Sequence, residues 1–126
     1  MIHDPRAAYL ANTVATASPA RLLIMLCDRL AIDVQRAHEA QLGGDHATAR
    51  LQLLHAQDIV AELRSSLDTE AWDGAPNLAA LYDWLFVALV RANTTRDPEL
   101  TQSCLNVASE LADTWRQAAL GMTRAS

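Results

Sequence analysis

The positions of proline and glycine constrain the fold of this 126-residue chain more than any other feature. The chain has four prolines, at Pro5, Pro19, Pro76 and Pro98. Three of them follow a residue whose side-chain oxygen can cap a first helical turn, namely Asp4, Ser18 and Asp97. Proline itself suits the first helical position because its missing N–H would have no partner there. Each proline therefore predicts the start of a helix.

A further junction is predicted at Gly43-Gly44-Asp45, where a glycine can end one helix at positive φ and Asp45 can cap the next. The remaining sequence favours helix throughout, because it has 24 Ala and 19 Leu but only three Trp, two Tyr and one Phe. We expect five helices, at about 5–15, 19–42, 46–70, 77–94 and 98–119. Short linkers make sequential helices antiparallel, so the prediction is an all-α, single-domain protein over residues 1–126. Its architecture would be an up-down four-helix bundle with a short additional N-terminal helix.

Two of the predicted helices carry more apolar surface than one core-facing stripe requires. The run from Trp84 to Val90 is apolar on all sides, and so is the run from Leu22 to Cys27. Such helices are either buried on two sides within their own bundle, or they complete a groove for a partner helix or a homodimer seam. The predicted N-terminal helix, with Tyr9 and Leu10 on its apolar face, is too short to be stable alone. It either docks permanently or acts as a removable cover.

Charge and motifs exclude several classes of function. All ten basic residues are arginines, spread along a chain of net charge −5, so no clustered basic surface indicates nucleic-acid binding. Glycine-rich nucleotide-binding loops are absent from the sequence, and so is any apolar run long enough for a membrane span. Cys27 and Cys104 have no CxxC spacing and are expected to be buried hydrophobes of a reducing compartment. We therefore expect a cytoplasmic protein without membrane insertion.

No catalytic, cofactor-binding or metal-binding group is expected. A di-iron bundle needs Glu-x-x-His pairs, but Gln35 precedes His38 and Gln52 precedes His55 at that spacing. Either histidine could serve a phosphotransfer bundle, although neither has a distinctive flanking sequence. The chain is therefore interpreted as a non-enzyme, with a phosphotransfer or metal-binding bundle and a self-associating adaptor as the alternatives.

An ordered set of short motifs, extending over about residues 9–116, resembles the flagellar secretion chaperone (FliS) family. The set comprises Tyr9, Thr16-Ala17-Ser18-Pro19-x-x-Leu22, Met25-Leu26-x-Asp28, Ala56-Gln57-Asp58-Ile59-x-x-Glu62-Leu63-x-x-x-Leu67-Asp68, Asn77-Leu78-x-x-Leu81-Tyr82-Asp83-Trp84, Ala92-Asn93 and Leu111-x-Asp113-x-Trp115. Cys27 stands where the family usually has Tyr, and Asp73-Gly74-Ala75-Pro76-Asn77 replaces its usual Gly-Gly-x-Ile.

The resemblance implies a chaperone that binds the C-terminal segment of flagellin along hydrophobic surface, prevents premature polymerisation and keeps the subunit competent for type III export. Components of the flagellar export gate are further expected partners, and the chaperone itself would be a monomer or a weak homodimer. Carried over residue by residue, the partner-binding positions are Tyr9, Leu10, Ser18, Pro19, Leu22, Met25, Leu26, Leu78, Leu81, Tyr82 and Trp84. Asp28 and Asp83 are interpreted as solvated or hydrogen-bonding acids of their helices.

Overall fold

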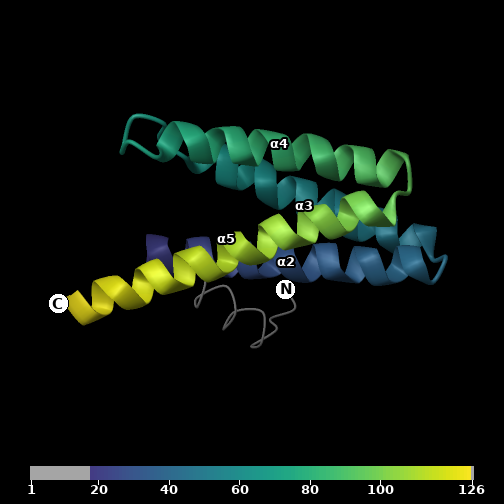
Figure 1. Ribbon diagram of the computed structural model, residues 1–126, viewed down its shortest axis with the longest axis horizontal. Coiled ribbons are helices and arrows are strands. Elements are labelled where there is room, and N and C mark those ends of the chain that lie inside the picture. Colours follow the sequence, from purple (N-terminus) through teal and green to yellow (C-terminus); the bar gives the residue numbers. More distant parts are fainter. Residues whose placement is uncertain (1–17, 126) are drawn as a thin grey trace, which may run out of the picture.

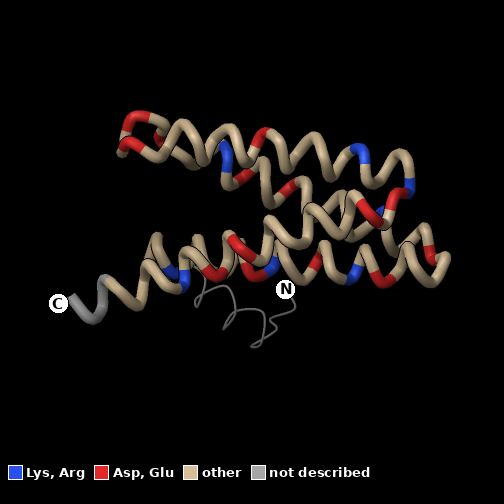
Figure 2. The backbone as a smooth tube through the Cα atoms, viewed as in Figure 1, with Lys and Arg blue, Asp and Glu red and all other residues tan. Residues whose placement is uncertain are grey.

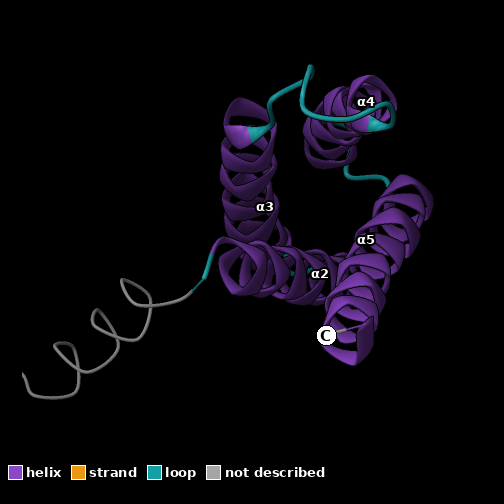
Figure 3. Cartoon of the chain, turned by 90° about the vertical axis from the view of Figure 1, so that its left-hand side faces the viewer, coloured by secondary structure: helices purple, strands orange, loops and turns teal. Residues whose placement is uncertain are grey.

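The computed structural model describes residues 18–125, and this part of the chain is all-helical, with four helices and no strand. The helices are α2 (Pro19–Leu42), α3 (His46–Ser66), α4 (Ala75–Thr94) and α5 (Pro98–Ala125). Each runs antiparallel to the next, and α2 and α4 each pack against both α3 and α5 (Figure 1; Figure 3 gives the end-on view). The expected N-terminal helix at 5–15, with Tyr9 and Leu10, lies outside the described residues. None of the described helices combines the length and apolarity that a bilayer span requires.

Capping side chains explain where three of the helices begin. The Ser18 hydroxyl accepts a hydrogen bond of 3.2 Å from the Arg21 amide. The Asp45 carboxylate accepts one of 3.1 Å from the Thr48 amide. Asp97 Oδ1 does the same for the amides of Glu99, at 3.0 Å, and Leu100, at 3.3 Å. Gly44 has a φ of 76°, which is the left-handed conformation expected of the glycine pair. The helix starts predicted from these residues are therefore correct.

The ends of α2 at Leu42 and of α4 at Thr94 also agree with the sequence prediction, but the remaining boundaries differ. Helix α3 ends at Ser66 rather than at residue 70, because Leu67 has extended backbone and Asp68 then accepts a hydrogen bond from the Glu70 amide, at 2.9 Å. Helix α4 begins at Ala75 rather than at 77, with Pro76 inside its first turn, and α5 continues to Ala125 rather than to 119. The α3–α4 connection therefore covers residues 67–74 rather than 71–76.

The core consists of leucines and valines interleaved with alanines, whose small side chains let the helices approach closely. Its fully buried members include Cys27, Leu30, Val34, Leu53, Val60, Leu85, Leu89 and Cys104. The apolar periodicity of the third helix predicts that Leu51 points inward, and this is wrong: Leu51 is 63% exposed, and Ala49, Leu53 and Ala56 are the buried residues there. The two cysteines are buried and unpaired, as expected.

Burial makes both thiols unreactive at neutral pH. It raises the pKa of Cys27 to about 11, with a smaller contribution from the neighbouring Asp28 charge, and it raises the pKa of Cys104 to about 11. The thiolate fraction in the native protein should be roughly 100-fold below that of a free cysteine. We expect a thiol reagent to label the native protein slowly and the urea-unfolded protein rapidly. Prompt labelling of both thiols in the native state would contradict this prediction.

The raised thiol pKa values also predict a pH dependence of stability. Because the unfolded chain releases these protons first, the free energy of unfolding should fall as pH rises from about 8.5 to about 11.

Candidate functional site

An apolar groove lies at the open end of the bundle, where α2 and α4 begin and α3 ends. In Figure 1 the α3–α4 pair and the α2–α5 pair diverge towards this end. The groove has a volume of about 300 Å³. Leucines from three helices line it together with Pro19, Tyr82 and Trp115, and Glu62 and Ser66 lie at its polar rim. We call it the end groove.

A second apolar groove of about 430 Å³ runs between α4 and α5. Its apolar lining comprises Trp72, Leu78, Leu81, Val107, Leu111, Trp115 and Ala118, and its polar lining comprises Asn77, Glu110 and Thr114. We call it the side groove. Leu78 and Trp115 line both grooves, so the two form adjoining parts of one apolar surface. Its lining contains two acids and no arginine.

The loop between α3 and α4 contributes Trp72 to the side groove. The ring of Trp72 lies against Gly74, where an added Cβ would meet ring carbon Cζ3 at 1.9 Å. Only glycine therefore allows the ring to lie in this position without displacement. The loop, shown in teal in Figure 3, crosses the end of the bundle between α3 and α4.

The structure brings together most, but not all, of the described residues predicted to bind a partner. Pro19, Leu22, Leu26, Leu78 and Tyr82 line the end groove, and Leu78 and Leu81 line the side groove. Leu22 is 37% exposed, whereas Tyr82 is only 2% exposed and belongs to the core. Burial also raises the pKa of Tyr82 to about 12.

Three of the predicted residues line neither groove. Ser18 is exposed and caps α2, and Met25 is half-buried on the same helix. Trp84 is 46% exposed on the outer surface of α4, and Phe86 and Val87 of the same helix are 38% and 57% exposed. The apolar surplus predicted on α4 is therefore real, but its outer part faces away from the grooves.

Several groove residues were not predicted as binding positions. They are Leu23, Leu63, Leu67, Trp72, Val107, Leu111, Trp115 and Ala118. Periodicity alone predicts one ordinary core-facing stripe on the third and fifth helices. The available signal was the motif set, which includes Leu63, Leu111 and Trp115.

The two acids near the predicted motifs make ion pairs between helices. Asp28 of α2 pairs with Arg116 of α5, and Arg116 also donates to Asp113 at 3.2 Å. Asp83 of α4 accepts a hydrogen bond of 2.9 Å from Arg64 of α3. All of these side chains are substantially exposed, so each pair contributes at most about 1 kcal/mol to stability.

The Arg64–Asp83 pair belongs to a third pocket, of about 500 Å³, between α3 and α4. Phe86 and Val87 line its apolar part. Tyr82 lines this pocket as well as the end groove, so its ring separates the two.

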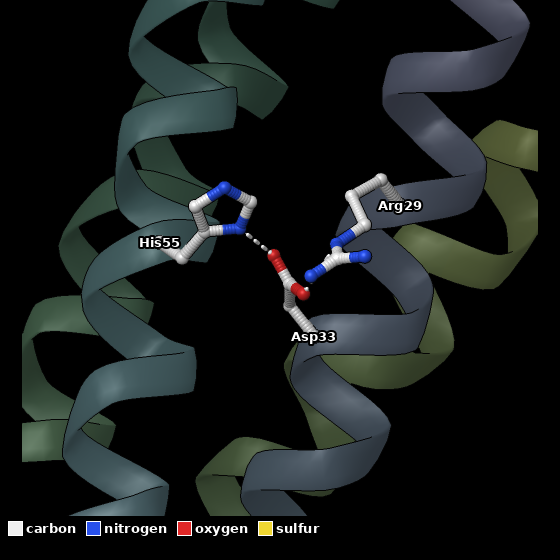
Figure 4. Close-up of polar contacts among 3 residues, drawn as sticks. All are labelled: Arg29, Asp33 and His55. Atoms are coloured by element: carbon white, nitrogen blue, oxygen red, sulfur yellow. Dashed lines mark hydrogen bonds and ion pairs between the residues drawn. The ribbon is translucent and has the colours of Figure 1, made fainter. Parts of the chain in front are cut away.

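His55, one of the histidines considered for phosphotransfer, has a structural environment. Its Nδ1 lies against Oδ2 of Asp33, while Arg29 Nε donates to the other carboxylate oxygen at 2.9 Å (Figure 4). The Asp33 side chain is fully buried, and its two partners are each 51% exposed. Arg29 and His55 together satisfy the buried Asp33 carboxylate, and the contact of His55 with Asp33 links α3 to α2. Among the described residues, no group of three or more His, Cys, Asp or Glu could hold a metal ion.

A family model and three known proteins match this chain, and all four carry the same family name. The family model described as "Flagellar protein FliS" matches residues 1–121. The "Flagellar secretion chaperone FliS" of Bacillus subtilis (strain 168) is 29% identical over 117 residues, which cover 93% of this chain and 87% of that protein. The protein of the same name from Salmonella typhimurium is 31% identical over 108 residues, covering 84% and 80% of the two chains. The one from Vibrio cholerae is 29% identical over 107 residues, covering 84% and 79%.

Proposed function

The chain belongs to the FliS family of flagellar secretion chaperones, and from this premise we propose that it binds the C-terminal segment of flagellin in the end and side grooves. Binding would cover the surface through which flagellin subunits associate, so that the subunit stays unpolymerised in the cytosol and competent for export. The observation that carries the proposal is the shared wall of Leu78 and Trp115, which joins the two grooves into one apolar surface.

The geometry of the grooves supports an amphipathic segment as the ligand. Their lining is apolar with a few polar residues at the rim, which is how a helix-binding groove receives the apolar face of a helix. The acids Glu62 and Glu110 are the charged residues of this lining. They favour a segment with basic or neutral side chains beside its apolar face. A segment that folds as it binds spends part of its interaction energy on ordering, so moderate affinity is expected.

The tryptophans of the chain provide a direct test. Trp72 and Trp115 line the grooves, whereas Trp84 lies outside them. Titration with a C-terminal flagellin peptide should shift tryptophan emission to shorter wavelength, because the peptide removes the groove tryptophans from water. Circular dichroism should show a gain in helicity beyond the sum of the separate spectra.

A matched pair of variants makes this test specific. Trp84→Phe should keep the emission shift, and Trp115→Phe should lose a large part of it. A scrambled peptide of the same composition should produce neither signal. Unchanged emission and unchanged helicity with the authentic peptide would rule out the proposed function.

A further inference from the structure

A small polar pocket lies at the end of the bundle opposite the two grooves. It is formed where α2 ends, α3 begins and α4 turns into α5, and its volume is about 260 Å³. Its polar lining residues are Gln41, His46, Arg50, Asn93, Thr94 and Arg96. None of these residues belongs to the proposed flagellin site.

Gln41 presents a buried acceptor at this pocket. The residue is 6% exposed, and its Nε2 donates to the carbonyl oxygen of Ala92 at 3.2 Å. Because a carbonyl can only accept, this bond fixes the orientation of the amide and makes Oε1 the other atom. Oε1 is buried and accepts no hydrogen bond from any residue between 18 and 125, and His46 Nδ1 is buried in the same state. A ligand there must donate to Gln41 Oε1 and can accept from His46 Nδ1.

The charged side chains of the pocket are arginines. Neither Arg50 nor Arg96 pairs with an acid within the described part of the chain, although the protein has a net charge of −5. Figure 2 shows basic residues at the end of α4 and in the following turn, beside the acids that begin α5. The nearby carboxylates of Asp45 and Asp97 are held by backbone amides as helix caps. His46 adds the first turn of α3, whose amides favour an anion.

The backbone at Arg96 is a second, independent observation. Arg96 has a φ of 51°, the left-handed conformation that glycine adopts most easily, and in the α2–α3 turn Gly44 has that role. A long side chain at such a position is strained, and strained residues concentrate at functional sites. The arginine therefore costs stability that a glycine would not, and it lines the pocket in return.

We propose that this pocket binds inorganic hydrogen phosphate. The guanidinium groups of Arg50 and Arg96 suit the charged oxygens, because arginine recognises oxyanions through several N–H donors at once. The Asn93 amide and the His46 ring can donate further hydrogen bonds. The remaining O–H of hydrogen phosphate donates to Gln41 Oε1. Sulfate or a phosphate monoester could satisfy the arginines equally well with two of its oxygens. Above neutral pH, however, neither of these dianions carries an O–H that could donate to Gln41 Oε1.

Calorimetric titration of the full chain at constant ionic strength and mildly alkaline pH tests the proposal. Sodium phosphate should bind at least about tenfold more tightly than sodium sulfate, because sulfate leaves Oε1 unpaired. Methyl phosphate, the simplest phosphomonoester, should bind as weakly as sulfate. Sulfate also controls for the general stabilising effect of such salts on folded proteins. Phosphate and sulfate binding with equal affinity, or no heat from millimolar phosphate, would overturn the proposal, and so would tighter binding of methyl phosphate than of phosphate.

Three variants link the binding to this pocket. Arg50→Gln and Arg96→Gly should each weaken phosphate binding at least about tenfold. Arg96→Gly removes the left-handed strain, so it should keep or raise the melting temperature, and its loss of binding cannot come from unfolding. Arg36→Gln is the control, because Arg36 is exposed on α2 and does not line the pocket. Equal weakening in all three variants would show unspecific attraction and contradict the assignment.

Discussion

Replacement of Tyr82 by alanine is expected to lower the free energy of unfolding by about 3–5 kcal/mol, because it removes a large buried ring from the core. The side chain is 2% exposed and packs among the central leucines of the bundle. The resulting cavity would lie between the end groove and the α3–α4 pocket, both of which Tyr82 lines. Urea unfolding followed by circular dichroism measures the change.

Tyr82→Phe is the matched control. It keeps the ring and should lower stability by much less than Tyr82→Ala. If the alanine variant unfolded at nearly the same urea concentration as the parent, the ring would not be a core element. The prediction has a practical consequence, since weak flagellin binding by Tyr82→Ala would report damage to the fold as well as loss of a contact.

Leu22→Asp is the sharper probe of flagellin binding. Leu22 lines the end groove and is 37% exposed, so the free protein can keep the new carboxylate hydrated. In the complex that carboxylate would be enclosed by apolar surface without a partner. We expect the affinity for the C-terminal flagellin peptide to fall at least about 100-fold, or ~2.7 kcal/mol, in a fluorescence titration.

Val87→Asp is the matched control, because it places the same carboxylate outside the two grooves. Val87 is 57% exposed on α4 and lines the α3–α4 pocket rather than either groove. Its replacement should leave the affinity unchanged. If Val87→Asp abolished binding and Leu22→Asp did not, the flagellin segment would occupy the α3–α4 pocket, and the assignment to the end and side grooves would be wrong.

The three capped helix starts were predictable from the sequence, and so were the ends of α2 and α4, but the ends of α3 and α5 were not. Ser18, Asp45 and Asp97 form the capping hydrogen bonds that their positions indicate, because a cap depends on atoms within one turn of chain. The end of α3 was placed too late, since the apolar period continues through Leu67. That leucine does contact the core, but it does so from extended backbone after the helix has ended.

The candidate site was predictable only in part, for a geometric reason. The predicted binding positions included most of the α2 and α4 residues of the grooves and none of the α3 and α5 residues that complete them. Leu63, Leu111 and Trp115 stood in the motif set, but no position on those two helices was carried over as a contact. A groove forms where helices distant in sequence diverge, and no local pattern encodes the divergence. Tyr82 and Trp84 illustrate the limit. The two residues are two positions apart in α4, so their side chains are rotated by about 200° about the helix axis. This rotation places the Tyr82 ring in the core and the Trp84 ring on the outer surface.

The packing of α2 against α5 also determines when, during synthesis of the chain, the fold can be completed. Helix α3 can pair with α2 and α4 once these have emerged, but α2 and α4 each lack one of their two partners until α5 has left the ribosome. The end groove takes its lining from α2, α3, α4 and α5 together. Nascent chains extend at about 5–20 residues per second, so the groove is completed within seconds of the last helix emerging. The groove proposed for flagellin therefore forms only after α5 has been synthesised, whichever of the other helices have already packed together.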